Sequence, residues 1–492
     1  MAITVVRKPQ KKFGPVGQDW LYSLQSTNVS QPKFKYVIDV KMHQLVSPGS
    51  VDVRLKISAD GLGIGNFNLR DILEQYVSSD NTAKLGAPHS TFRGQQIVFA
   101  DGFELPVHLI QQYTQSNFAL CHFTLEFGEE YASTTTGPTT VYNNLFTDAD
   151  NTVFNGVAPN RSQKYYFNSG TDAGYAVDIQ DNNASTVGSI YGGPYVAHTG
   201  SPNAKFITNA PTNQYCRAGD FMTVAIFTGF INGVAAAWDR ISIEFPNGNK
   251  YEVPCNATFN GRNGSGDGAI QPIGRHWHYF GIGPGNQTGI TDFDNNYGLN
   301  DYYDFALYKG TNAVASNRTS LYYRINKMED DCKGYETIRL CWLNRHGAWD
   351  YYNFTKKSFR EIDIQKEYLQ HDNVNYVLGV KKHNFFRTNS VYNTTAKERI
   401  TANTDWVDDE HAIWLEELFT SPEVYMLGQF NPNDLGTDSY MLDLNYVTPV
   451  IITNNKYERY TSANDKVAQY EIEIEVDNTV NVQKNQRGLQ KL

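Results

Sequence analysis

The most constraining feature of this chain is an alternation of apolar and polar side chains that recurs along it. Residues 50–58 (SVDVRLKIS), 121–127 (CHFTLEF) and 470–477 (YEIEIEVD) all show a period of two. Successive side chains of a β-strand point to opposite faces, so this period predicts strands with one buried and one solvated face. Such strands are typical of antiparallel sheets and sandwiches.

Two segments predict β-hairpins. In residues 241–253 (ISIEFPNGNKYEV), the turn is expected at Pro246 to Asn249. In residues 338–354 (IRLCWLNRHGAWDYYNF), two aromatic-rich strands flank a polar turn at residues 344–347.

The second hairpin also carries Cys341, His346 and Asp350, the side-chain types of a nucleophilic site. A nucleophile needs a base within hydrogen-bonding reach and a third group that orients the base, and this spacing does not require either. The GxSxG, HExxH and phosphate-loop motifs are absent from the sequence. We therefore interpret the segment as structural, predict no catalytic residue and no cofactor, and expect a protein that is not an enzyme.

Helices are expected in two places. Residues 68–77 (NLRDILEQYV) have an apolar stripe at helical spacing, with Asn68 as the predicted N-cap. Residues 405–420 (DWVDDEHAIWLEELFT) have a second stripe and an acidic first turn, and Pro422 is expected to end the helix.

Composition supports a β-rich fold. The 492 residues include 32 Tyr, 27 Phe and 39 Gly, and residues 130–215 are rich in Thr, Asn, Asp and Gly, which predicts long loops. We expect a mainly β protein of two or three antiparallel β-sandwich-like domains with long polar loops and a few short helices. The expected parts are an N-terminal arm and sandwich (1–130), a loop-rich insertion (131–215), a central sandwich (216–390) and a C-terminal helix-plus-strand module with a basic tail (391–492).

The net charge of −10 argues against a nucleic-acid partner, which usually requires a basic face. Basic residues gather near the two ends of the chain: Arg7, Lys8, Lys11, Lys12, Lys484, Arg487 and Lys491. They are either solvated tails or assembly arms that dock on acidic neighbours. Five irregularly spaced cysteines predict neither a disulfide framework nor a zinc site, and the N-terminal apolar run is too short for a signal peptide, so folding in a reducing cytoplasm is expected.

Two weaker signals concern metal and membrane. His276 and His278 could share one strand face, and Asp148, Asp150, Asp292, Asp294, Asp301 and Asp304 lie in polar stretches. No EF-hand fits, because Tyr297 and Tyr303 stand where its Gly and Glu belong, and an irregular Ca²⁺ site stays open. The uncharged residues 221–238 reach the length of a membrane span, but Asn232-Gly233 interrupts them, so two buried strands are expected instead of stable membrane insertion.

Four stretches carry a family resemblance: residues 31–40 (QPKFKYVIDV), 339–354, 405–426, and the tail that begins YEIEIEVDNTVNVQKNQRG. In this order they resemble β-rich virion proteins of the tail or baseplate type from tailed bacteriophages, especially phages of Bacteroidetes and marine hosts. The resemblance implies a structural subunit of the virion tail, baseplate or neck. Such a subunit would be made in the host cytoplasm and would form a symmetric homo-oligomer with other virion proteins as partners.

Two alternatives stay open. A receptor-binding virion protein could hold host-surface glycans with the loops at 131–215, where Tyr165, Tyr166, Phe167 and Tyr175 could stack on sugar rings. A glycan-cleaving enzyme would need two carboxyl groups about 5–9.5 Å apart in a cleft, and the sequence indicates no such pair.

Overall fold

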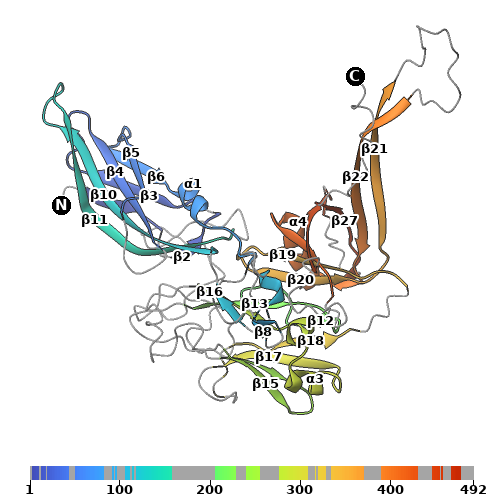
Figure 1. Cartoon of the computed structure of the whole chain (residues 1–492). Helices are drawn as coiled ribbons and strands as arrows, with labels where there is room; N and C mark the ends of the chain where they lie inside the picture. The colour runs from blue at the N-terminus through green and yellow to red at the C-terminus, as the bar shows by residue number, and fades with distance from the viewer. Residues whose placement is uncertain are drawn as a thin grey trace, which may run out of the picture. The chain divides into compact units, whose positions relative to one another are not determined.

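The structure is a computed structural model, and it describes most but not all of the chain. The described residues are 3–9, 13–17, 19–43, 50–82, 91–92, 95–96, 106–110, 113–115, 118–157, 205–228, 240–254, 276–308, 316, 318, 320–328, 334–370, 389–429, 446–454, 456–457 and 467–477. The fold is mainly β, as the alternation predicts, with several sheets and few short helices (Figure 1).

The chain divides into two compact units. The first contains Met1–Glu329, Leu343–Asp350 and Gln429–Leu442, and the second contains Asp330–Trp342, Tyr351–Gly428 and Asp443–Leu492. Two of the expected domain boundaries, at residues 130 and 390, fall inside strands that the structure describes as continuous.

A β-sandwich forms the N-terminal part of the first unit (Figure 1). One sheet has the order β1-β3-β6, from Ile3–Arg7, Leu21–Ser26 and Ile64–Asn68. The other has the order β2-β11-β10-β4-β5, from Phe13–Pro15, Thr139–Phe154, Leu120–Ala132, Lys35–His43 and Val53–Ile57. All pairs in the two sheets are antiparallel except β2 with β11.

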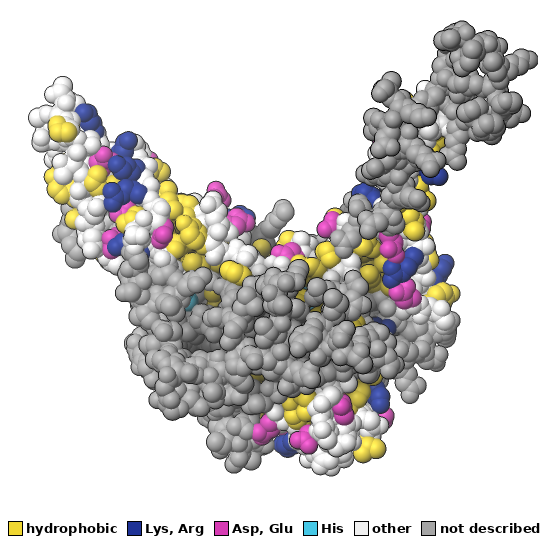
Figure 2. All heavy atoms as spheres, in the orientation of Figure 1, with side chains coloured by type: hydrophobic (Ala, Val, Ile, Leu, Met, Phe, Trp, Pro, Cys, Tyr) yellow, Lys and Arg dark blue, Asp and Glu magenta, His cyan; other side chains and the backbone are white. Residues whose placement is uncertain are grey.

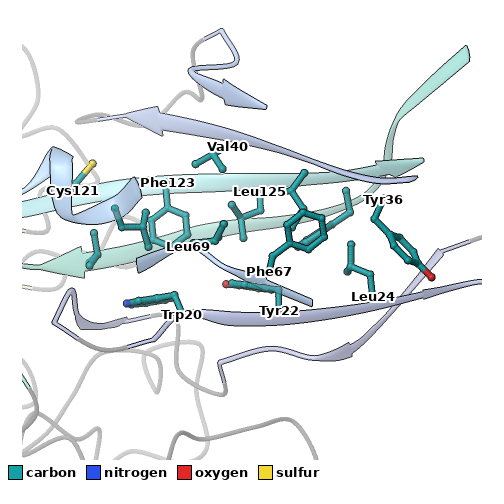
Figure 3. Close-up of a cluster of buried hydrophobic side chains, with 14 of the residues drawn as sticks. Trp20, Tyr22, Leu24, Tyr36, Val40, Phe67, Leu69, Cys121, Phe123 and Leu125 are labelled. Atoms are coloured by element: carbon teal, nitrogen blue, oxygen red, sulfur yellow. The ribbon is translucent and has the colours of Figure 1, made fainter. Parts of the chain in front are cut away.

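The core of this sandwich lies between the two sheets (Figure 3). Trp20 packs edge-on against Phe123 with ring centroids 5.4 Å apart, and Tyr22 lies 5.7 Å from Phe127. The odd-numbered apolar residues of β10 supply one wall of the core, as the alternation in residues 121–127 predicts. Each fully buried large apolar side chain of this kind stabilises the fold by roughly 1.5–3 kcal/mol.

Strand β11 corrects one sequence prediction. Residues 139–154 were expected within long loops, yet they form a 16-residue strand paired with β10. Their Asn, Asp and Thr side chains favour turns locally, but the ladder to β10 satisfies the backbone of both strands, and two bulges absorb the irregular sequence. Tertiary pairing therefore overrides local propensity here.

The remainder of the first unit contains two further sheets and short helices. The sheet β12-β18-β17-β14-β15 is built from Asn213–Cys216, Tyr323–Lys327, Tyr302–Tyr308, Arg240–Glu244 and Lys250–Pro254. The sheet β13-β16-β9 is built from Thr223–Thr228, His276–Gly281 and Tyr113–Gln115. The smaller elements are α1 (Arg70–Leu73), η1 (Glu74–Tyr76), η2 (Val107–Leu109), α2 (Pro284–Gln287), α3 (Thr291–Tyr297) and the pair β7 (Thr91–Phe92) and β8 (Gln95–Gln96).

Several local predictions are confirmed in this unit. Strands β14 and β15 form the expected hairpin, with Gly248 at φ +86° in its turn. Strand β13 occupies residues 223–228 of the uncharged segment, and the second strand expected there lies outside the described residues. Among the residues that the structure describes, no helix is long and apolar enough to cross a membrane. The helix expected at 68–77 is shorter, and its N-cap is Leu69, so the prediction of Asn68 as N-cap is wrong. Asn68 Oδ1 instead accepts from the Arg70 N–H at 3.1 Å, two residues along.

The second unit contains most of a seven-stranded sheet, of which Leu343, Trp349 and Asp350 belong to the first unit. Its order is β20-β19-β24-β25-β27-β22-β21, from Trp349–Phe354, Ile338–Leu343, Val424–Leu427, Val447–Ile452, Glu471–Val476, Asn389–Asn403 and Phe359–Gln370. Strands β19 and β20 form the hairpin expected at 338–354. A small sheet pairs β23 (Val407–Asp408) with β26 (Val467–Ala468).

The C-terminal helix α4 (Asp409–Thr420) ends at the predicted residue but begins later than residue 405, because Val407–Asp408 pair with β26. Asp408 is its N-cap and accepts from the His411 N–H at 2.9 Å. The ring of Trp414 lies 5.0 Å from that of Trp342 on β19, so the helix packs on the sheet face that carries Trp342.

Candidate functional site

The predicted basic arms are only partly described. Arg7 ends β1, opposite Ser23 of β3. The Lys8 Nζ lies 3.4 Å from Asp148 Oδ1 of the same sandwich, so Lys8 is held by its own unit. The other predicted arm residues, Lys11, Lys12, Lys484, Arg487 and Lys491, lie outside the described residues, and their docking role stays a prediction.

The predicted receptor contacts Tyr165, Tyr166, Phe167 and Tyr175 also lie outside the described residues. Strand β11 removes residues 139–154 from the loops that the receptor hypothesis would use. Receptor binding by the remaining residues of this segment, 155–215, stays a prediction.

The residues resembling a nucleophilic site have environments that favour packing. Cys341 is fully buried in the second unit, and burial raises the pKa of its thiol well above the ordinary value. A nucleophilic cysteine needs a lowered pKa, so this environment does not favour a thiolate.

His346 and Asp350 lie in the first unit, in and beside the turn of the hairpin. Burial, with a smaller contribution from Arg345, lowers the pKa of His346 to about 3 and keeps the ring neutral. Asp350 Oδ1 accepts from Thr208 Oγ1 at 2.6 Å and from Asn344 Nδ2 at 3.1 Å, so its role is to fix the turn.

Two of the aspartates considered for Ca²⁺, Asp294 and Asp304, have separate structural partners. Asp294 Oδ2 accepts from the Gly289 N–H at 2.9 Å, in the first turn of α3. Asp304 receives two bonds from Arg324, at 2.8 and 3.0 Å. The structure describes no group of three or more His, Cys, Asp or Glu residues that could hold a metal ion, and the side chains of His276 and His278 are not among those it describes.

The sequence interpretation missed the most exposed element of the described structure, β21. This strand ends the seven-stranded sheet, and all twelve of its residues are exposed. It pairs with β22 over residues 389–401, whereas β27 pairs with β22 only over residues 399–403. The two strands therefore continue beyond β27 as a two-stranded ribbon (Figure 1).

One face of this ribbon continues the buried face of the sheet. Ile400 and Ile474 lie opposite each other on β22 and β27 and are 1% and 0% exposed. On β21 this face carries Arg360, which lies opposite Ile400, and then Ile362 and Ile364, which are 53% and 58% exposed. Arg360 Nη1 lies 2.5 Å from Glu398 Oε1, and Glu398 stands opposite Ile362, so a charged pair separates the buried isoleucines from the two exposed ones. In the described part of the chain, Ile362 and Ile364 remain more than half exposed.

The opposite face is mainly acidic. By strand register its acidic residues are Glu361, Asp363, Glu367, Glu471, Glu473 and Glu475, and its basic residues are Lys397 and Arg399. Arg399 Nη1 lies 2.9 Å from Asp363 Oδ2, and Lys397 pairs with Glu475. The Lys397 hydrogen bond is the leading cause that lowers the pKa of Glu475. Acidic groups outnumber basic ones, so this face attracts positive charge.

A second open edge, β5, has the complementary pattern. Its odd-numbered residues Val53, Leu55 and Ile57 pack against the sandwich core, and Arg54 and Lys56 lie on the other face. Arg54 bonds both carboxylate oxygens of Asp39, at 2.6 and 2.7 Å, and Lys56 Nζ lies 2.8 Å from Glu130 Oε2. Figure 2 shows basic side chains beside acidic ones over the N-terminal sandwich.

The edge strand β21 could have been located from sequence but not identified as a site. Residues 360–364 (REIDI) alternate in the manner of a strand with one buried face. That pattern predicts a covered apolar face, and only the strand order shows that β21 is last in its sheet.

Comparison with known proteins adds no assignment. No protein-family model matches this chain, and a search of curated proteins finds no relative.

Proposed function

We propose that this chain is a non-enzymatic structural subunit of a bacteriophage particle, placed in the tail, baseplate or neck. In this proposal it assembles with copies of itself and with other virion proteins. The proposal starts from the resemblance of the four sequence stretches to virion proteins of tailed phages.

The observation that carries the proposal is the open edge of β21. An edge strand presents unpaired N–H and C=O groups and is a template for pairing with another chain. Here the edge is twelve residues long, and Ile362 and Ile364 are more than half exposed on it. Such an edge suits a subunit whose neighbours cover it in an assembly.

The test is the protein content of purified particles. Particles of the phage that encodes this chain are banded on a density gradient, and their proteins are quantified by mass spectrometry against the major capsid protein. We expect this chain in a fixed copy number that survives repeated banding, and antibody labelling then gives its position on the particle. Its absence from intact particles that retain their tails would overturn the proposal.

A further inference from the structure

The edge strands of the described structure differ in the chemistry of their two faces. On β21, Glu361 and Asp363 alternate with Ile362 and Ile364. Among the edge strands that the structure describes, β5 alone places two basic residues on one face and an apolar row on the other. A second copy of β21 is a poor partner for β21, because like charges facing each other across strands are destabilising.

Backbone hydrogen bonds fix which residues of β21 direct their peptide groups outward. The Thr404 N–H donates to Tyr470 O at 2.9 Å, in the register of β22 with β27. Even-numbered residues of β22 therefore face β27, and odd-numbered ones such as Arg399 face β21. Arg399 lies opposite Glu361, so the odd-numbered residues of β21 face β22 and the even-numbered ones face outward.

The same argument applies to β5. The Asp52 N–H donates to Val40 O at 3.0 Å, which directs the peptide groups of Val40 toward β5. Val40 lies opposite Val53, so the odd-numbered residues of β5 face β4. Arg54 and Lys56 therefore direct their backbone N–H and C=O groups away from the sheet.

These directions decide how the two edges fit. In an antiparallel pair, outward-facing residues lie opposite each other, which would place Arg54 and Lys56 against Ile362 and Ile364. In a parallel pair, the backbone of an outward-facing residue forms hydrogen bonds with two residues of the other strand. These two residues lie on either side of the one directly beside it. The parallel pair can therefore set Arg54 beside Glu361, Lys56 beside Asp363, Leu55 beside Ile362 and Ile57 beside Ile364.

We propose that β21 of one copy pairs in parallel with β5 of the next copy, in this register. Basic side chains then meet acidic ones on one face, and the two apolar rows join on the other. Each copy offers one β5 and one β21, so the contact is head-to-tail and generates a ring or a filament. The inference rests on the proposed structural function, because it names the self-contact of that assembly.

Cross-linking between two different variants tests the contact and its register. Lys56→Cys and Asp363→Cys are introduced in separate full-length chains, which are mixed under mild oxidation and separated on a non-reducing gel. We expect a disulfide-linked dimer only from the mixture, since residues 56 and 363 would be neighbours across the contact. Lys56 is replaced because its partner Glu130 also accepts from Thr139 Oγ1 at 2.7 Å, whereas removal of Arg54 would leave the buried Asp39 carboxylate without its bidentate partner.

The matched control pairs Lys56→Cys with Glu473→Cys. Glu473 lies on the same acidic face as Asp363, but on β27, two strands in from the edge. We expect no dimer from this mixture. Equal dimer yields from the two mixtures, or none from Lys56→Cys with Asp363→Cys, would overturn the proposed register.

Self-association of charge variants provides a second readout. By light scattering, the double variant Glu361→Lys/Asp363→Lys should need at least about tenfold higher concentration to associate, because like-charge contacts across an interface cost several kcal/mol. Glu473→Lys should leave association unchanged, and circular dichroism checks that both variants are folded. A wild-type chain that stays monomeric, or an oligomer indifferent to the double variant, would overturn the inference. If the chain is nevertheless found in particles, the proposed function survives with a different contact surface.

Discussion

His346 lies in the turn between β19 and β20, where the residue is 3% exposed and its backbone N–H donates to Asn344 Oδ1 at 3.0 Å. The same Asn344 Oδ1 accepts from the Ala348 N–H at 3.1 Å, and Asn344 Nδ2 donates to Ile207 O at 3.0 Å. At the scale of single residues, these polar groups satisfy the buried backbone of a turn. Buried backbone groups need such partners, which accounts for the polar residues in this segment without invoking catalysis.

The buried imidazole predicts a loss of stability in mild acid. Its pKa is about 3 in the folded protein against an ordinary value of 6.5, so the unfolded chain binds a proton at pH values where the folded chain does not. The contribution of the neutral His346 ring to the free energy of unfolding is complete above pH 6.5 and is lost as the pH falls toward 3. Between pH 7 and pH 5 the free energy of unfolding should fall by about 2 kcal/mol from this group.

The measurement is urea unfolding of the wild-type chain and His346→Asn at both pH values. Asparagine does not titrate, so the variant should lose less stability on acidification than the wild type does. Equal losses in the two proteins would show that His346 does not carry this pH dependence.

At the scale of elements, close backbone approach decides whether a turn tolerates a side chain. Gly347 has φ +82°, and a Cβ built on it would lie 1.9 Å from the carbonyl oxygen of Asn155. Gly248, in the turn between β14 and β15, has φ +86° and no heavy atom within 4 Å of such a Cβ. The two glycines share a left-handed backbone conformation and differ in their surroundings.

This pair predicts different costs for the same substitution. Gly248→Ala should lower the free energy of unfolding by about 1 kcal/mol, which reflects the left-handed backbone alone. Gly347→Ala should lower the free energy of unfolding clearly more, because the added methyl group also meets a backbone carbonyl that cannot move aside independently. Urea midpoints of the two variants provide the comparison, and a smaller loss for Gly347→Ala would contradict the packing described here.

At the scale of the whole molecule, isoleucines on one face of the seven-stranded sheet lie in two different environments. Ile474 is buried in the second unit, whereas Ile362 and Ile364 lie on the open edge of the same sheet face. Buried positions set the stability of the unit, and exposed edge positions are available for contacts with other chains.

Threonine substitutions distinguish the effect of the buried isoleucine on stability from the effect of the exposed ones on self-association. Ile362→Thr/Ile364→Thr should change the free energy of unfolding by less than about 1 kcal/mol, because surface substitutions have small effects, while weakening self-association. Ile474→Thr should destabilise the fold by about 2 kcal/mol or more, since it buries a hydroxyl where a well-packed side chain stood. Chemical denaturation and light scattering measure the two properties, and a large stability loss in the edge variant would contradict its exposure.

The sequence by itself determined the local structure of this protein wherever one physical signal dominates. Alternation located β5, β10 and β27, turn residues located both hairpins, and an apolar stripe at helical spacing located α4. These features depend on residues close together in the chain. The sequence could not place β11, whose Asn, Asp and Thr residues form a strand only because β10 supplies a ladder.

Strand order was decided by the tertiary structure alone. Residues 360–364 and 472–476 have similar alternation, yet one lies at the edge of the sheet and the other in its interior. Which of two similar strands is covered depends on pairing between segments far apart in the chain. For this reason the sequence predicted that the chain would form sheets, and only the fold showed that β5 and β21 each lie at the edge of one.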